Sequence, residues 1–231
     1  MFGRSKKARR DREAAEQVEQ VVEDVVGPFD VSEAPDDGVA RLDFGSLRIP
    51  NPADVKVQVE FVEKTHVVRQ VQIVQDDSEV HVGVFAAPRN EDVWEEAREE
   101  IVKSVERKGG QVEEVDGPYG VELLARGKGH GATVRYAGVS GPRWLLRAVF
   151  RGPRAEDVDA APALDEALRG MVVDRGEAAM PILEALPLKM PPQAVELHKK
   201  RAELAAARKA GATPGRVNGA GSRRPSPKPK R

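Results

Sequence analysis

Short stretches of alternating apolar and polar residues in the middle of the chain predict strands with one buried face. Residues 55–62 alternate valine and phenylalanine with lysine, glutamine and glutamate, and residues 67–74 and 80–86 are rich in β-branched side chains. An Asp-Asp-Ser sequence at residues 76–78 separates the last two stretches and is typical of a tight turn. We therefore expect an antiparallel meander in this part of the chain.

A second group of predicted strands follows later in the chain. Residues 143–151 (RWLLRAVFR) carry the strongest strand pattern, and residues 40–49, which end at Pro50, predict a short edge strand. Further strands are expected at residues 111–115, 119–126 and 132–139, with turns at 116–118 and 127–131.

Two segments have the three- and four-residue spacing of amphipathic helices. Residues 91–108 place Trp94 and other apolar side chains on one stripe, with Asn90 in the position of an N-cap and a glycine pair after the end. Residues 156–175 predict a second helix that closes the body. The apolar residues 181–188, bounded by prolines, are expected to pack against the domain.

The order of these elements, strands, helix, strands and helix, predicts the α+β class. We expect an antiparallel sheet with helices packed against it, because the strand-helix alternation of a parallel sheet is missing. The expected single domain spans residues 39–192. The expected flanking segments are an N-terminal arm at 1–38, with a marginal helix at 11–26 and a linker at 27–38, a charged helix at 193–210, and a disordered basic tail at 211–231.

Charge is distributed unevenly along the chain, although the formal net charge is only -1. Residues 1–12 contain six basic side chains and one acidic one, and residues 211–231 contain six basic side chains and no acidic one. The remaining chain holds 25 basic and 37 acidic side chains, a net charge of about -12. The sequence therefore predicts an acidic body with basic ends.

Composition excludes several classes of protein. The chain has no cysteine, which excludes a disulfide scaffold, thiol catalysis and iron–sulfur clusters. No apolar run reaches the roughly 20 residues that a membrane-spanning helix needs, and no apolar stretch follows the charged start. We therefore expect no membrane insertion and a cytoplasmic location.

No motif in the sequence indicates a catalytic centre. The glycine-rich residues 127–131 (GKGHG) lie between two expected strands, which favours a hairpin loop over a phosphate-binding loop. The four histidines His66, His81, His130 and His198 fall in different expected elements without the spacing of metal ligands. No serine lies in a nucleophile elbow. We expect no catalytic residue, metal or cofactor, and the pattern does not favour an enzyme.

The predicted strand at residues 143–151 carries a candidate interaction surface. One face of this strand is apolar and is expected in the core, whereas the opposite face interleaves Arg143, Arg147 and Arg151 with two aliphatic residues. Two interpretations stay open. The arginine stems either cover a partly exposed sheet with their heads paired to acids, or they form a surface for an anion or a partner.

Three stretches of the chain resemble an uncharacterised actinobacterial family, domain of unknown function 3710. They are WEEAREEIVKSVERKGGQVEEVDGPYGVEL, VSGPRWLLRAVFRG and EALPLKMP. The resemblance covers residues 39–192 and the basic start at 1–10, and it implies family membership without an activity or catalytic residues. The order of elements is also similar to the Mog1/PsbP-like fold, whose members mostly act as binding and assembly factors.

Three hypotheses for the function follow. The first is a non-enzymatic binding or adaptor protein that acts through protein–protein contacts. The second is a nucleic-acid-associated factor that binds weakly and without sequence preference through its ends, although 4% aromatic residues provide few stacking surfaces. The third is an enzyme with an unrecognised site built from distant residues such as Glu122, His130 and Arg143. The residues expected to make electrostatic contacts from the ends are Lys6, Lys7, Arg9, Arg10, Arg223 and Arg224.

Overall fold

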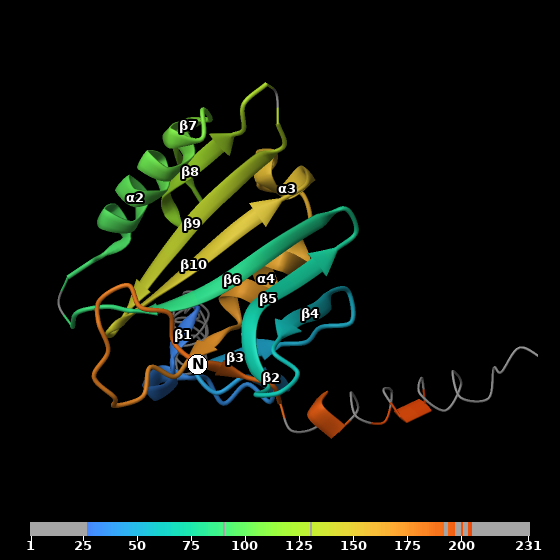
Figure 1. Cartoon of the computed structure of the whole chain (residues 1–231). Coiled ribbons are helices and arrows are strands. Elements are labelled where there is room, and N and C mark those ends of the chain that lie inside the picture. Colours follow the sequence, from blue (N-terminus) through green and yellow to red (C-terminus); the bar gives the residue numbers. More distant parts are fainter. Residues whose placement is uncertain are drawn as a thin grey trace, which may run out of the picture. The chain divides into compact units, whose positions relative to one another are not determined.

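The computed structural model describes residues 27–89, 91–129 and 131–191, together with residues 194–196, 200, 203 and 204. The chain divides into two units, residues 1–191 and 192–231, and the fold below is that of the first. It has the α+β architecture expected from the sequence, with a large antiparallel sheet and few helices (Figure 1).

Within the described residues, eight strands form the large sheet. Consecutive strands are antiparallel neighbours in two meanders, β4-β5-β6 and β7-β8-β9-β10. β10 pairs with β6 from Trp144 opposite Ala86 to Arg151 opposite Glu79, and this pairing joins the meanders. The strands are β4 (Lys56–Phe61), β5 (Val67–Gln75), β6 (Ser78–Ala86), β7 (Gln111–Gly117), β8 (Gly120–Arg126), β9 (Thr133–Gly141), β10 (Trp144–Arg151) and β12 (Leu188–Lys189).

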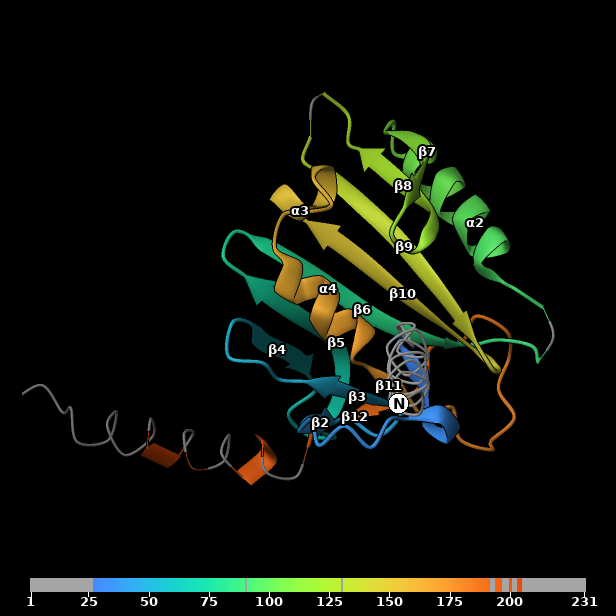
Figure 2. The same cartoon turned by 180° about the vertical axis from the view of Figure 1, so that it is seen from behind.

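A small sheet and three helices lie against the large sheet. The order of the small sheet is β1-β11-β3-β2, formed by β1 (Phe29–Asp30), β11 (Val172–Val173), β3 (Leu47–Pro50) and β2 (Arg41–Asp43). Helix α2 (Trp94–Arg107) packs on one face of the large sheet. Helix α4 (Pro162–Arg169) packs on the other face, together with the short α3 (Pro153–Glu156) and the small sheet, as the two opposite views show (Figures 1 and 2).

Alternation along β10 divides the apolar interior into two cores. Trp144, Leu146, Ala148 and Phe150 point into the larger core, beneath α4 and the small sheet. Leu145 points to the other face and packs with Trp94, Ala97, Ile101 and Leu123 in the core under α2. The expected core face of this strand is therefore confirmed, and its opposite face is also partly buried.

The prediction of a single helix at residues 156–175 is wrong. α3 ends at Glu156, α4 spans Pro162–Arg169, and residues 172–173 form β11. Pro162 starts a new helix because its ring fixes φ and removes the amide that a continuous helix would need. Ala161, with a left-handed φ of 56°, separates the two helices.

The N-terminal boundary of the folded unit also differs from the expectation. Residues 27–38 were expected as a linker, but Phe29 and Asp30 form β1, which pairs in parallel with Val172 and Val173, and residues 31–33 form a 3-10 turn. The expected edge strand at 40–49 is a hairpin of β2 and β3, which turns at Gly45 with a φ of 82°. Short strands of this kind carry little alternation for a pattern to detect.

Helix α2 begins later than the sequence pattern suggests. Its first residue is Trp94, and Oδ1 of Asp92 accepts the Trp94 amide at 2.8 Å. This local bond offers the backbone an alternative to a helical turn, so residues 91–93 stay outside the helix. The expected N-cap, Asn90, lies outside the described residues.

In the second unit the described residues are helical, which is the conformation expected for residues 193–210. The expected helix at 11–26 and the tail at 211–231 fall outside the described part of the chain.

Candidate binding groove around Arg147

On the face of the large sheet that carries α2, the helix contacts β7 and β9 and covers the start of β10 at Leu145, but a hollow stays open along β6 and the rest of β10, next to β5. We call this uncovered part the open face. The side chains that alternate onto it follow the register of the three strands, in which Gln72 lies opposite His81, Val149 opposite His81, and Arg147 opposite Gly83. The open face therefore combines polar, cationic and apolar side chains.

A gap between two strands deepens the open face. β5 pairs with β6 only from Val71 to Gln75, and the start of β5 diverges to pair with β12. Residues 183–186 take its place beside β6, where the Leu186 amide donates to the Val84 carbonyl and the Ala86 amide to the Glu184 carbonyl, at 2.8 and 2.9 Å. The predicted packing of residues 181–188 against the domain thus forms one wall of a groove.

Both cross-strand neighbours of Arg147 are glycines, Gly83 on β6 and Gly138 on β9, so no neighbouring side chain stands directly beside it. A Cβ at Gly83 would lie 3.1 Å from the ring of Phe85, and a Cβ at Gly138 would lie 2.2 Å from the ring of Trp94. The missing side chains make room for these two aromatic rings. The guanidinium carbon of Arg147 lies 4.7 Å from the centre of the Phe85 ring, a cation–π contact.

The guanidinium of Arg147 has no carboxylate partner among the described residues, and its buried Nε has no hydrogen-bond acceptor. Burial lowers the pKa of Arg147, with the nearby Tyr136 opposing this shift. Arg151, on the same face, is more exposed and lies 3.9 Å from Glu79. A half-buried cation without an anion is costly, so Arg147 is suited to receive an anionic group from outside.

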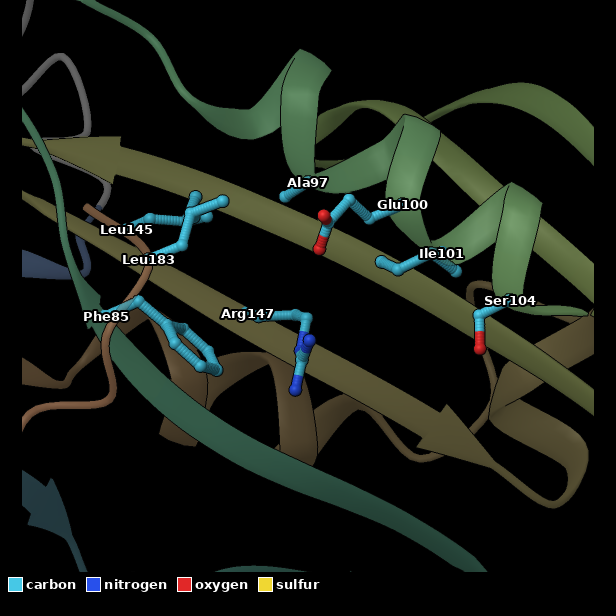
Figure 3. A pocket seen from close by; sticks show the side chains of 8 residues that line it. All are labelled: Phe85, Ala97, Glu100, Ile101, Ser104, Leu145, Arg147 and Leu183. Atoms are coloured by element: carbon cyan, nitrogen blue, oxygen red, sulfur yellow. The ribbon is translucent and has the colours of Figure 1, made fainter. Parts of the chain in front are cut away.

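Two hollows meet at Arg147. The first, which we call the α2 pocket, has a volume of about 270 Å³ and lies between α2 and β10 (Figure 3). Figure 3 shows Glu100 and Ser104 extending from α2 on one side, with Arg147 and Phe85 on the other. Its remaining wall is apolar and consists of Ala97, Ile101, Leu145 and Leu183.

The second hollow, which we call the arginine groove, has a volume of about 340 Å³ and runs along β6 and β10. Its cationic lining residues are Arg69, Arg147 and Arg151, and no aspartate or glutamate is among the described residues that line it. Apolar side chains also line the groove: Val149 lies between Arg147 and Arg151 on β10, and the buried Leu186 forms part of the wall. The groove is thus a cationic site on a chain whose body is acidic.

A polar network holds two lining residues of the arginine groove, Gln70 and His81, through Glu79, which does not itself line the groove. Nε2 of His81 lies 2.9 Å from a carboxylate oxygen of Glu79, so it carries the proton and donates. Nδ1 of His81 accepts from the amide of Gln70, and the amide of Gln72 donates to Glu79. Because both ring nitrogens are engaged, His81 has no free nitrogen to take a proton from a substrate in this arrangement.

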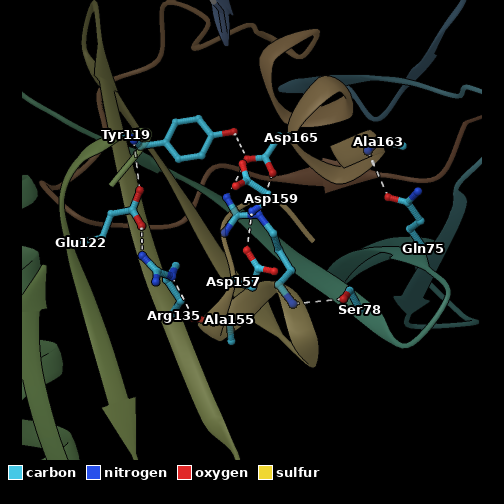
Figure 4. Close-up of polar contacts among 11 residues, drawn as sticks. Gln75, Ser78, Tyr119, Glu122, Arg135, Ala155, Asp157, Asp159, Ala163 and Asp165 are labelled. Atoms are coloured by element: carbon cyan, nitrogen blue, oxygen red, sulfur yellow. Dashed lines mark hydrogen bonds and ion pairs between the residues drawn. The ribbon is translucent and has the colours of Figure 1, made fainter. Parts of the chain in front are cut away.

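A buried ion network lies on the other face of the large sheet (Figure 4). Glu122 is 0% exposed, accepts from Nη1 of Arg135 at 2.9 Å, and accepts from the Tyr119 amide at 3.0 Å. Asp165 accepts two bonds from the buried Arg154, at 2.7 and 2.9 Å, and one from the Tyr119 hydroxyl at 2.7 Å. Burial raises the pKa of Tyr119, and Asp165 adds to this effect. The network ties α3 and α4 to β8 and β9, and Glu122 is enclosed rather than presented to a substrate.

The structure places the sequence-derived candidates differently. Arg147 and Arg151 share the open face, whereas Arg143 lies in the turn before β10 with a φ of 65°, and its carbonyl accepts from Ala87 and Arg175. Arg143 is therefore not on the strand face where we expected it. The candidates Lys6, Lys7, Arg9, Arg10, Arg223 and Arg224, and the histidines His130 and His198, lie outside the described residues.

Several groove residues were not singled out by sequence reasoning. Phe85, Gly83 and Glu100 belong to elements that were predicted, but their meeting around Arg147 depends on strand order and on the position of α2. An isolated glycine inside a strand pattern is a signal of close approach, and Gly83 carries it.

No group of three or more histidine, aspartate or glutamate side chains in the described part of the chain could hold a metal ion. No described helix is long and apolar enough to cross a membrane. Among curated proteins no relative matches the chain. Residues 27–197, about three quarters of the chain, match a family described as protein of unknown function (DUF3710), and the chain therefore belongs to this family.

Proposed function

We propose that this protein is a non-enzymatic binding protein whose arginine groove docks an acidic segment of a protein partner. The observation that carries the proposal is the guanidinium of Arg147, which is half-buried in the groove without a carboxylate partner among the described residues. A partner carboxylate would satisfy this cation and accept the bidentate hydrogen bonds that a guanidinium offers.

The lining of the groove favours an acidic segment that also carries apolar side chains. Arg69 and Arg151 lie in the same groove as Arg147, and the half-buried Val149 lies between Arg147 and Arg151 on β10. An extended segment alternates its side chains, so carboxylates could meet the arginines while an apolar residue covers the valine. Charge complementarity of this kind increases the association rate and excludes wrong partners.

Nucleic acid also carries negative charge, but the groove is a poor match for it. Outside the two basic ends the chain has a net charge of about -12, which would repel a phosphate backbone over distances beyond the groove. Recognition of a single strand also uses stacked aromatic residues, and the aromatic side chains of the groove are Phe85 and Tyr136. A short acidic segment reaches the three arginines without bringing a long anionic polymer against an acidic surface.

A titration with synthetic peptides tests the proposal. The probe is an extended peptide that alternates glutamate with leucine, and its matched control has every glutamate replaced by glutamine. We expect the acidic peptide to bind the full chain, measured by fluorescence anisotropy, and the glutamine peptide to bind at least about tenfold more weakly. Binding of the acidic peptide should weaken as salt is raised, because part of the groove is exposed.

Three substitutions locate the binding on the protein. Arg147→Gln and Arg151→Gln should each weaken binding of the acidic peptide. Arg126→Gln, at the exposed end of β8, should leave this binding unchanged. An unchanged thermal transition shows that each variant is folded. Equal binding of both peptides, or equal binding by the Arg147→Gln variant, would refute the proposal. If an oligonucleotide bound more tightly than the acidic peptide, and this binding depended on Arg147, the ligand of the groove would be nucleic acid rather than a protein.

A further inference from the structure

The α2 pocket places opposite charges on opposite walls of an apolar hollow. Glu100 extends from α2, and Arg147 lies across the pocket on β10 (Figure 3). Both residues are described, and no ion pair joins them. The apolar side chains of Ile101, Leu145 and Leu183 form the wall on either side of these charges (Figure 3). The cation is half-buried Arg147, which has no carboxylate partner among the described residues, and the anion is the exposed carboxylate of Glu100, which also attracts Lys103 one turn on. Opposite charges beside an apolar surface are complementary to a small zwitterion with an apolar side chain.

We propose that the α2 pocket binds a free apolar α-amino acid. The carboxylate of the ligand lies on the guanidinium of Arg147, the ammonium group on the carboxylate of Glu100, and the aliphatic side chain against Leu145 and Leu183. The cation–π contact with Phe85 holds the guanidinium in place, so less rotational freedom is lost when the ligand binds.

The volume of the pocket fits a ligand of this size. The pocket measures about 270 Å³, and a dry cavity of about 150 Å³ in another protein is large enough for benzene. A six-carbon amino acid such as leucine therefore fits, with room for ordered water beside its polar groups. Ser104 also lines the pocket and offers its hydroxyl to such a water or to the ligand.

This site goes beyond the proposed protein-docking function and does not rest on it. The two share Arg147 and Phe85, but Glu100 and Leu183 line the α2 pocket and not the arginine groove, and Arg69 and Arg151 line the arginine groove and not the α2 pocket. Variants at the unshared residues therefore separate the two proposals.

The test is calorimetric titration of the full chain with L-leucine and two analogues. The first analogue, 4-methylpentanoate, lacks the amino group, and the second, isopentylamine, lacks the carboxylate. We expect L-leucine to bind with a dissociation constant below about 10 mM, and each analogue to bind at least about tenfold more weakly, because each leaves one charge unpaired. Absence of leucine binding at about 10 mM would refute the site, and so would equal binding of 4-methylpentanoate.

Variants complete the test. Glu100→Gln and Arg147→Gln should each weaken leucine binding at least about tenfold, because each removes one charge-assisted contact. Glu96→Gln, one turn earlier on the exposed side of α2, is the matched control and should bind leucine like the wild type. The Arg151→Gln variant should also bind leucine like the wild type, although its binding of the acidic peptide is weakened. Leucine binding that is indifferent to Glu100→Gln would overturn the assignment, even if the acidic peptide still depends on Arg147.

Discussion

The indole Nε1 of Trp144 donates a hydrogen bond of 2.9 Å to Oδ2 of Asp30. Trp144 begins β10 at the centre of the large sheet and is 1% exposed, whereas Asp30 ends β1 in the small sheet. The bond therefore joins the two sheets through residues that are far apart in the sequence. It also shows why the residues before position 39 contribute to the folded unit.

Trp144→Ala should destabilise the protein by about 3–5 kcal/mol, because it removes a fully buried aromatic side chain from the larger core. Trp144→Phe retains an aromatic ring but loses the donor to Asp30, so it should cost less than the alanine variant. Chemical denaturation monitored by circular dichroism measures both. A Trp144→Ala variant as stable as the wild type would mean that the Trp144 side chain does not pack in the larger core.

The lowered pKa of Asp30 predicts that the protein loses stability at acid pH. Burial raises the pKa of Asp30, but hydrogen bonds from the side chain and amide of Ser32 and from Trp144 outweigh burial, and the net pKa is lowered. A carboxyl with a lowered pKa stabilises the fold above its unfolded pKa of about 3.9, and this contribution is lost as the pH falls through the folded pKa.

The measurement is the free energy of unfolding at several pH values from about 6 downward. The wild type should lose stability more steeply below pH about 4 than Asp30→Asn, which has no proton to bind at this position. Parallel curves for the two proteins would show that the carboxylate of Asp30 is not stabilised by its partners.

Gly138→Ala should destabilise the protein because the added methyl group would lie 2.2 Å from the ring of Trp94. Helix α2 must then move away from β9, which we expect to cost about 1–3 kcal/mol. Gly127→Ala is the matched control, since its Cβ would make an ordinary contact at 3.6 Å. Thermal unfolding distinguishes the two, and equal melting temperatures would contradict the close packing of Trp94 on Gly138.

The buried pair of Glu122 and Arg135 predicts a non-additive double-mutant cycle. Glu122→Leu alone leaves the guanidinium of Arg135 without its buried anion and should cost about 3–5 kcal/mol. The double variant Glu122→Leu/Arg135→Met removes both charges, so it should be more stable than Glu122→Leu alone. Urea denaturation of the four proteins measures the coupling, and additive losses would mean that the two side chains do not interact.

Much of the fold could be predicted from the sequence because its long strands alternate strongly. The strands around Val57, Val82 and Leu146 were expected close to their observed bounds, and the antiparallel meander expected for residues 55–86 is that of β4, β5 and β6. The resemblance to domain of unknown function 3710 was also confirmed, whereas the similarity to the Mog1/PsbP-like fold stays a prediction. The turn predicted at the Asp-Asp-Ser sequence was also confirmed, since β5 ends at Gln75 and β6 begins at Ser78.

The elements that the sequence did not predict are short or form only through contacts with residues far away in the chain. β1 and β11 have two residues each, too few to show a period, and they form because Phe29 and Val172 meet across the chain. The helix pattern at 156–175 continued through Pro162, where propensity alone does not fix whether a helix bends or ends. Arg147 and Arg151 were singled out as a candidate surface, but the groove itself needed the divergence of β5 from β6. The interaction role of this surface stays a prediction.

The most direct test of the docking proposal is photo-crosslinking from the arginine groove. A benzophenone amino acid in place of Val149, which lies between Arg147 and Arg151, would crosslink whatever occupies the groove in cells. Mass spectrometry of the products should identify protein segments rich in aspartate and glutamate, and the added Arg147→Gln substitution should abolish them. Crosslinks to nucleic acid, to segments without acidic residues, or at equal yield with Arg147→Gln would contradict the proposal.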